Sequence, residues 1–176
     1  MSKPDLSVAI GNLKLKNPVM LASGTVGYGN EISALTDLSK LGAIVTKSLS
    51  LKPRKGNPPQ RIVETAAGML NAIGLANVGV DEFIREKIPF LRQVDSTIIC
   101  NIAASTIEEY GECVRILTGE EVIKGFEINI SCPNVREGGL IFGHDKKAVS
   151  RITSVLRGIT NKPLIIKLSP NFPDIA

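Results

Sequence analysis

Short apolar runs alternate with stretches of helical spacing along most of this chain. The apolar runs are near-continuous, which is typical of strands that are buried on both faces of a parallel sheet. Five such strands are predicted, at residues 18–23, 43–48, 96–103, 125–131 and 163–169. Helices are predicted between them, at residues 31–41, 80–91, 105–117 and 146–159.

Local signals refine these elements. The turn dipeptide at residues 11–12 lies between two short β-rich runs and predicts an N-terminal hairpin. Asp81 is expected to cap the second helix, and Ser105, with Glu108 three residues on, is expected to cap the third. The segment GMLNAIGLANVG, residues 68–79, is either a linker or a functional loop, and a long loop in a compact α/β domain is usually functional.

The alternation of strands and helices fits two layouts, an open doubly wound sheet and a (β/α)8 barrel. Neither GxGxxG nor GxxxxGK[ST] follows the first strand, and the glycines of SGTVGYG have a different spacing. These absences argue against a Rossmann fold and against a P-loop fold, the nucleotide-binding forms of the open sheet. The ends of the strands favour the barrel, because each apolar run closes on small or polar groups. These groups are Ser23, Gly24, Lys47, Ser48, Asn101, Asn129, Cys132 and Lys167.

In a barrel all strands open onto one face at their carboxyl ends, so these groups would share a pocket. The alternative is that strands simply end in polar residues. That alternative explains poorly why Lys47 and Lys167 occupy the same relative place on two strands, because an ammonium there is costly without a partner. We therefore expect an α/β fold, a (β/α)8 TIM barrel of which about five β/α units lie in this chain.

Composition narrows the class of protein further. The 176 residues fit one domain, and 43% hydrophobic and 22% charged residues are ordinary for a globular chain. No apolar run reaches 18 residues and no signal peptide is recognisable, so we expect a cytoplasmic protein that does not act at a membrane. The net charge of +4 suits an anionic ligand, whereas 4% aromatics without Trp argue against nucleic-acid binding. Three cysteines without CxxC spacing and a single histidine suggest no metal site.

Cys132 is the first candidate for chemistry. A lone cysteine is most often a small buried hydrophobe. Here Pro133 stiffens the loop that carries it, and Asn129 and Asn134 flank it with amide groups that could bind a planar ring. A thiol can act as a general base if it loses its proton, and its ordinary pKa of about 8.5 allows this. The only histidine, His144, lies on a loop expected to be exposed, and Cys100 and Cys113 are expected to be filler.

Lys47 and Lys167 are either exposed lysines or cations that stabilise an electron-rich cofactor or a substrate carboxylate. Asn71 could join Asn129 and Asn134 as a hydrogen-bonding frame for a small polar ring. The basic stretch KPRKGNPPQR, residues 52–61, is expected to be a solvated loop rather than a binding patch.

Six segments, in this order, resemble the FMN-dependent dihydroorotate dehydrogenases: LASGTVGYG, VTKSLS, NAIGLANVG, NISCPN, GGLIFG and IIKLSPN. Each segment alone is a weak signal, but the ordered set is specific. The resemblance is to class 1, and within it to the NAD-linked, two-subunit (1B) type. It runs over the whole chain, residues 1–176, as the N-terminal portion of a single FMN-binding barrel domain.

The resemblance implies oxidation of dihydroorotate to orotate in pyrimidine (UMP) synthesis. Cys132 would take a proton from C5 while the C6 hydride goes to FMN. The substrate would be held by Lys47, Asn71, Ile73, Gly74, Leu75, Asn129 and Asn134. FMN would be contacted by Ala22, Ser23, Gly24, Lys47, Ser48, Asn101, Asn129 and Lys167. The segment EGGLIFGHD resembles a loop that closes over the substrate. Implied partners are a second copy, forming a homodimer, and an FAD- and iron–sulfur-containing subunit that passes electrons to NAD.

Two departures from the family pattern stand out. Ala66, Ala76 and Val78 replace residues that are often proline, glutamine and proline in relatives. The chain is also short for a barrel of about 250 residues. We therefore expect a truncated fragment, the product of a split gene or one part of a longer protein. In each case it would lack the FMN phosphate glycines, and alone it would leave the edges of its first and fifth strands exposed. Two alternatives stay open: a related FMN flavoprotein that acts on dihydropyrimidines, and a non-catalytic half-barrel that serves as an assembly module.

Overall fold

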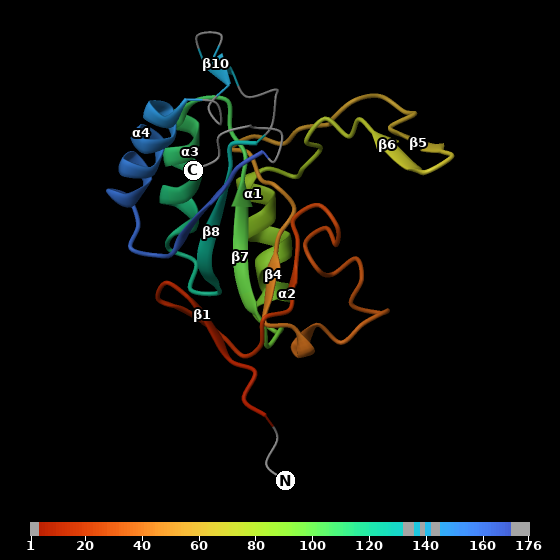
Figure 1. Cartoon of the computed structure of the whole chain (residues 1–176), viewed down its shortest axis with the longest axis vertical. Helices are drawn as coiled ribbons and strands as arrows, with labels where there is room; N and C mark the ends of the chain where they lie inside the picture. The colour runs from red at the N-terminus through yellow and green to blue at the C-terminus, as the bar shows by residue number, and fades with distance from the viewer. Residues whose placement is uncertain (1–3, 132–135, 138–139, 142–144, 170–176) are drawn as a thin grey trace.

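A five-stranded parallel sheet forms the centre of the molecule (Figure 1). The computed structural model describes residues 4–131, 136–137, 140–141 and 145–169. The sheet has the order β3-β4-β7-β8-β11, so every strand lies beside the next one along the chain. Its strands are β3 (Met20–Leu21), β4 (Ala43–Val45), β7 (Thr97–Ile102), β8 (Ile123–Asn129) and β11 (Leu164–Lys167). This order confirms the five predicted strands and the barrel, since a doubly wound sheet reverses its strand order at a switch point.

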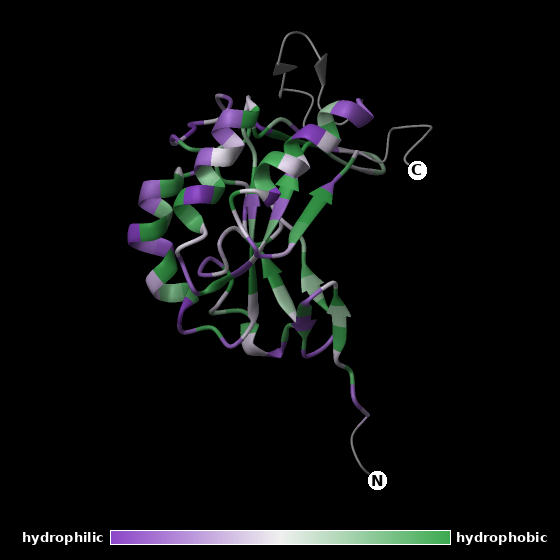
Figure 2. Ribbon diagram, turned by 90° about the vertical axis from the view of Figure 1, so that its left-hand side faces the viewer, coloured by the Kyte–Doolittle hydropathy of each residue, from purple (hydrophilic) through white to green (hydrophobic). Residues whose placement is uncertain are grey.

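Helices cover one face of the sheet. They are α1 (Val80–Glu82), the π-helical η2 (Phe83–Lys87), α2 (Ile88–Leu91), α3 (Ile107–Leu117) and α4 (Lys146–Arg157). The residues of β7 that face them, Ile98, Cys100 and Ile102, are fully buried in the main hydrophobic core. Hydrophobic colouring concentrates on the strands, whereas the helices carry both kinds of residue (Figure 2). Within the described part of the chain, no helix has the length and apolarity needed to cross a membrane.

The opposite face of the sheet is closed at its amino-terminal end by the predicted hairpin. Strands β1 (Val8–Ile10) and β2 (Leu13–Leu15) pair antiparallel, with Ile10 opposite Leu13. Leu13 and Leu15 are buried in a second, smaller cluster. Its other buried members are Ala43, Val45 and Ile99, with Met20 and Ile165 packed against it. The interior of the half-barrel therefore has an apolar floor built by the N-terminal hairpin.

The segment between β4 and α1 contains a hairpin that the sequence analysis did not predict. Strands β5 (Ile62–Thr65) and β6 (Gly68–Asn71) pair antiparallel, and Figure 1 shows them projecting well away from the sheet. All eight residues of the two strands are exposed. A second small ladder joins β9 (Arg136–Glu137) to β10 (Leu140–Ile141).

The predicted helix at residues 31–41 is wrong. Only the 3-10 turn η1 (Leu38–Lys40) forms there, after a series of turns. Asp37 is extended, with φ −79° and ψ 99°, and its carboxylate accepts a hydrogen bond from the Ser39 N–H at 3.0 Å. This side chain offers the backbone a turn in place of a helix, which is why Asp is unfavourable inside helices. Leu35, a member of the apolar spacing, is 85% exposed.

Both predicted helix caps are also wrong in detail. Gly79 is the N-cap of α1 and provides no side-chain bond, while Asp81 lies inside the first turn. Thr106 caps α3, with its Oγ1 accepting from the Glu109 N–H at 3.2 Å. The Glu109 carboxylate in turn accepts from the Ser105 N–H at 2.8 Å. The cap lies one residue beyond the predicted position, and the Glu109 carboxylate bonds the residue before the cap, whereas in a capping box it would bond the cap residue itself.

Candidate functional site

Along the inner face of the sheet, side chains change from apolar to polar toward the carboxyl ends of the strands. On β7, the apolar floor residue Ile99 is followed two positions on by Asn101. On β11, Ile165 is followed by Lys167. Residues two apart on a strand share a face, so each polar side chain lies directly above the floor. The polar groups therefore occupy the mouth of the half-barrel, where barrel enzymes place their active sites.

Four polar side chains meet there, and each comes from a different strand or strand end. Lys167 Nζ donates to Ser23 Oγ at 2.9 Å, and Asn101 Nδ2 donates to the same Oγ at 3.3 Å. Glu127 accepts a hydrogen bond from Asn101 Nδ2 and forms an ion pair with Lys167 Nζ at 3.4 Å. The predicted convergence of strand ends is therefore confirmed for Ser23, Asn101 and Lys167.

The contact between Ser23 and Lys167 also measures the curvature of the sheet. Ser23 follows β3 and Lys167 ends β11, and these are the two edge strands. In a flat sheet four strand spacings would separate them by about 19 Å, which no lysine side chain spans. The edges approach each other across the inner face, so the sheet is curled as in a barrel.

Asn101 carries a hydrogen-bond acceptor that the protein does not use. The side chain is fully buried, and its Oδ1 has no hydrogen-bond partner within the described residues. Its Nδ2 is taken by Ser23 and Glu127. Because buried polar atoms nearly always have a partner, an unpaired amide oxygen in the cluster is a natural place for a ligand donor.

Strand β4 is followed by an irregular step that presents Lys47 and Ser48. The Thr46 N–H donates to the Ile99 carbonyl at 3.0 Å, and the Leu49 N–H donates to the Asn101 carbonyl at 2.9 Å. Between these two bonds, the Asn101 N–H donates to the side chain of Thr46, at Oγ1, at 3.1 Å. Lys47 and Ser48 are thereby left outside the ladder, as in a β-bulge, a feature common beside active sites.

Asn129 links this step to the end of β8. Its Nδ2 lies 3.4 Å from Ser48 Oγ, and its Oδ1 accepts from Ser131 Oγ at 2.6 Å. The buried Tyr110 hydroxyl donates to the Asn129 carbonyl at 2.7 Å. Asn129 is thus held from both ends at the mouth of the half-barrel. Cys132, Pro133, Asn134 and His144 lie outside the described residues.

The first βα turn brings Ala22 and Gly24 to the same end of the sheet. The Ala22 carbonyl accepts from the N–H and the hydroxyl of Thr25, at 3.3 and 2.7 Å. Gly24 has a φ of 83°, which a residue with a side chain rarely adopts. A Cβ there would meet nothing within 4 Å, so the glycine is required by the turn and not by crowding.

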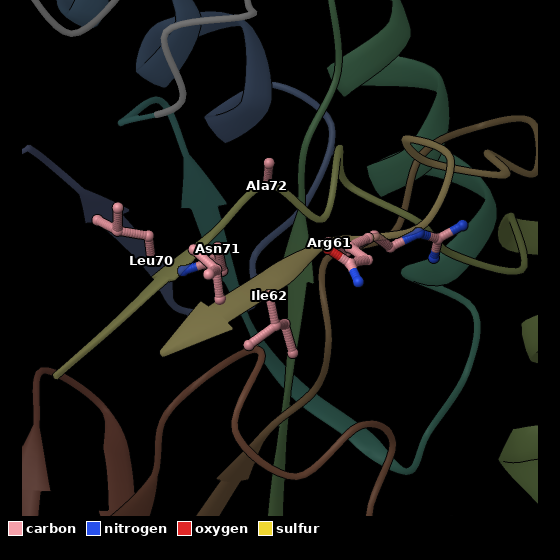
Figure 3. A pocket seen from close by; sticks show the side chains of 7 residues that line it. Arg61, Ile62, Leu70, Asn71 and Ala72 are labelled. Carbon is pink, nitrogen blue, oxygen red and sulfur yellow. The ribbon is translucent and has the colours of Figure 1, made fainter. Parts of the chain in front are cut away.

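Asn71 is placed differently from the other candidates. It lies at the end of β6, exposed, in the hairpin that projects from the sheet. There it lines a pocket of about 320 Å³ together with hairpin residues that include Arg61, Ile62, Leu70 and Ala72 (Figure 3). This pocket is separate from the polar cluster. Arg61 donates through Nη2 to the Lys55 carbonyl at 3.0 Å, so the basic stretch is partly tied into its own loop.

The segment after Asn71 is anchored by a residue that the sequence analysis did not single out. Gly74 and Leu75 both have positive φ, 73° and 55°, and Leu75 is the only non-glycine residue of this kind in the described chain. Asn77 Nδ2 donates to the Leu75 carbonyl and to Ser50 Oγ, both at 2.8 Å. Asn77 Oδ1 accepts from the N–H groups of Ser50 and Gly79, at 3.2 and 2.9 Å. Asn77 therefore ties the strained turn to the loop that follows Lys47 and Ser48.

Cys100 and Cys113 are confirmed as core residues. Burial raises the pKa of each thiol to about 12, so both stay protonated over the physiological range. Glu127 is a site residue that the sequence analysis missed. The alternation of β8 places Glu127 on the same side as Asn129, two positions on, but only its contacts with Asn101 and Lys167 mark it as a site residue.

The fold and the polar cluster define a protein of the α/β-barrel class with a candidate ligand site at the carboxyl ends of its strands. Residues 5–176 match the family model described as dihydroorotate dehydrogenase. The chain belongs to the dihydroorotate dehydrogenase family.

Similar curated proteins carry the name of one type of dihydroorotate dehydrogenase. The chain is 58% identical over 175 residues to the protein of Geotalea daltonii named dihydroorotate dehydrogenase B (NAD(+)), catalytic subunit. It is 55% identical to the protein of the same name from Geobacter sulfurreducens. Each alignment covers 99% of this chain and 57% of the relative, so the chain spans little more than half the length of these proteins.

A solved structure supports the fold. The structure of DHODH from Eimeria tenella, in complex with ferulenol, superposes with a TM-score of 0.74 at 20% identity. The match covers 97% of this chain and 54% of that one. At this identity the likeness bears on the fold alone, and it agrees with a half-barrel of a (β/α)8 architecture.

Proposed function

We propose that residues 1–176 form the N-terminal portion of a single FMN-binding barrel domain that oxidises dihydroorotate to orotate in pyrimidine synthesis. The observation that carries the proposal is the polar cluster at the mouth of the half-barrel, with its unpaired Asn101 acceptor. Family membership and the names of the curated relatives support the same activity. They favour it over a dihydropyrimidine-specific flavoprotein and over an assembly module without catalysis.

Dihydroorotate dehydrogenases depend on a flavin, and the described residues fit one. A flavin offers N–H and O–H donors, and the buried Asn101 Oδ1 is an acceptor without a protein partner. Ser23, Ser48 and Asn129 supply further small polar groups at the same end of the sheet, with Ala22 and Gly24 in the adjoining turn. Lys47 and Lys167 supply positive charge that favours an anionic ring. When bound, FMN would accept the hydride that leaves C6 of the substrate.

The chain's own residues would carry the proton chemistry and the positioning. Cys132 is the proposed base that removes the C5 proton, so its thiolate is the active form. Asn129, Asn134 and Asn71 would hydrogen-bond the substrate ring and carboxylate, together with the backbone of Ile73, Gly74 and Leu75. Lys47 would lie between the flavin ring and the substrate ring. For Asn71 to take part, the hairpin that carries it has to fold back toward the mouth of the barrel.

The proposed partners follow from the type of the relatives, whose names describe a catalytic subunit of an NAD(+) enzyme. A homodimer of the catalytic subunit and a second subunit with FAD and an iron–sulfur cluster would complete the electron path to NAD. We propose a cytoplasmic location for this assembly.

The decisive experiment uses a full-length catalytic subunit that carries residues 1–176, completed where necessary from the Geotalea daltonii relative. Anaerobic addition of dihydroorotate is expected to bleach the absorbance of bound FMN. Cys132→Ala should slow this step by roughly 10²–10⁴-fold, the usual contribution of a general base. The matched control is Cys113→Ala, which removes a core thiol and should bleach at the rate of the parent.

Two further measurements separate the alternatives. Dihydrouracil lacks the carboxylate, so faster bleaching by dihydrouracil than by dihydroorotate would favour the dihydropyrimidine flavoprotein. A full-length protein that binds no FMN would contradict the proposal outright. The rate for the parent should rise with pH through the pKa of Cys132, because the base must lose its proton before it can act.

A further inference from the structure

Glu127 occupies an unusual place for a carboxylate. It lies in the middle of β8 between the fully buried Phe126 and Ile128, and its side chain is only 14% exposed. Its alternation with Ile128 turns it to the inner face, on the same side as Asn129. A carboxylate buried in this way is destabilising unless charges and donors compensate it.

Two partners compensate it, and both belong to the polar cluster. Asn101 is directly opposite Glu127 in the β7–β8 register and donates its Nδ2 to the carboxylate. Lys167 lies two residues beyond the cross-strand partner of Glu127 on β11, within diagonal reach, and forms the 3.4 Å ion pair. Glu127 therefore touches two of the residues proposed to meet the flavin.

We propose that Glu127 is a positioning residue of the flavin site that acts through Asn101 and Lys167. The inference rests on the proposed function, because it concerns the same cluster. For Asn101, a carboxylate can only accept, so it holds the amide with Nδ2 toward β8 and leaves Oδ1 for the ligand. For Lys167, the carboxylate offsets part of the ammonium charge that would otherwise act on the flavin.

The charge effect has a definite direction. A cation beside the flavin ring favours its reduced form, which carries more negative charge, and so raises the midpoint potential. A carboxylate paired with that cation opposes the effect. Glu127 therefore keeps the potential of the bound flavin lower than Lys47 and Lys167 alone would set it, which a merely structural residue would not do.

The test measures FMN affinity and the midpoint potential of bound FMN in the full-length subunit described above. Glu127→Gln keeps the size of the side chain and removes its charge. We expect about a tenfold gain in preference for reduced over oxidised FMN, which is a rise of about 30 mV for a two-electron couple. Glu121→Gln is the matched control, because it removes the same charge from an exposed residue before the other end of β8 and should leave the potential unchanged.

Glu127→Asp provides the second variant. It keeps the charge but shortens the side chain by one methylene, so its potential should stay nearer to the parent than to Glu127→Gln. Its FMN dissociation constant should rise several-fold, because the carboxylate no longer reaches the Asn101 amide. Circular dichroism and thermal unfolding show which variants are folded.

The outcomes separate the two proposals. A parent protein that binds no FMN overturns the proposed function and this inference with it. A parent that binds FMN, with the same potential in Glu127→Gln as in Glu121→Gln, overturns only the role of Glu127. If Glu127→Gln fails to fold, the FMN affinity of Glu127→Asp is the test. A several-fold weaker affinity supports the positioning of Asn101, and a parent-like affinity overturns it and the proposal with it.

Discussion

At the scale of single residues, Asn77 has the clearest consequence for the proposed substrate loop. Its side chain bridges Ser50, Leu75 and Gly79 through hydrogen bonds of 2.8–3.2 Å. Asn77→Ala removes the bond that holds the Leu75 carbonyl, and Leu75 sits in a left-handed conformation that needs such support. We expect the KM for dihydroorotate to rise about tenfold, with a smaller change in kcat, in steady-state assays of the full-length subunit.

The control for this prediction is Asn161→Ala, an exposed asparagine in the turn before β11. It should change neither constant. FMN affinity should also survive Asn77→Ala, because none of its partners belongs to the residues proposed to contact the flavin. Equal loss of FMN and substrate binding would mean that Asn77 supports the whole barrel mouth and not the loop.

The residues of the site could be named from the sequence only in part. Ser23, Asn101 and Lys167 were predictable because strand ends converge in a barrel, whatever the detailed packing. Glu127 and Asn77 were not, because the contacts that make them important include partners far away in the sequence: Asn101 for Glu127, 26 positions away, and Ser50 for Asn77, 27 positions away. The bulge at Lys47 was equally hidden, since it depends on Thr46 Oγ1 replacing a backbone partner for Asn101.

At the scale of elements, the N-terminal hairpin is predicted to stabilise the half-barrel by packing against the amino-terminal end of its sheet. Leu15 is 2% exposed and packs in the floor cluster with Val45 and Ile99. Leu15→Ala should lower the free energy of unfolding by about 2–5 kcal/mol, the cost of a cavity in a core that cannot collapse fully. Urea unfolding of the parent and the variant measures this difference in the free energy of unfolding.

Leu6→Ala is the comparison for that experiment, because Leu6 precedes the same hairpin but is 58% exposed. Its unfolding free energy should stay within about 0.5 kcal/mol of the parent. Similar losses in the two variants would show that the hairpin does not form a packed floor.

The elements that the sequence predicts well are those with a strong, uninterrupted pattern. The five sheet strands and the helices α3 and α4 follow directly from apolar runs and helical spacing. The helix expected at residues 31–41 fails because Asp37 hydrogen-bonds to Ser39 and extends the chain. The β5–β6 hairpin was missed because its residues are exposed on both faces, so no buried pattern marks it.

At the scale of the whole molecule, curvature is the feature that makes a site from separate strands. Ser23 and Lys167 stand on opposite edges of the sheet, yet their side chains meet. No local pattern in the sequence predicts that contact. It follows from the sequential strand order together with the sheet twist, which bring the first and fifth strands toward each other as a barrel begins to close.

The buried thiols give the molecule a predictable response to alkaline pH. Burial, followed by the nearby Glu109, raises the pKa of Cys113 from the ordinary value of a thiol to about 12. Between these values the folded thiol keeps its proton while the unfolded thiol loses it. The contribution of Cys113 to stability is therefore complete below pH 9 and is lost as pH rises toward 12.

Cys113→Ala isolates this effect, because its packing cost does not depend on pH. Urea unfolding of parent and variant at pH 8 and pH 10 should show the parent's advantage shrinking by about 1 kcal/mol, since each pH unit above 9 is worth up to about 1.4 kcal/mol per thiol. An advantage that stays constant would mean that the Cys113 thiol ionises as easily in the folded protein as in the unfolded chain. That result would contradict its place in the core between the helices and the sheet.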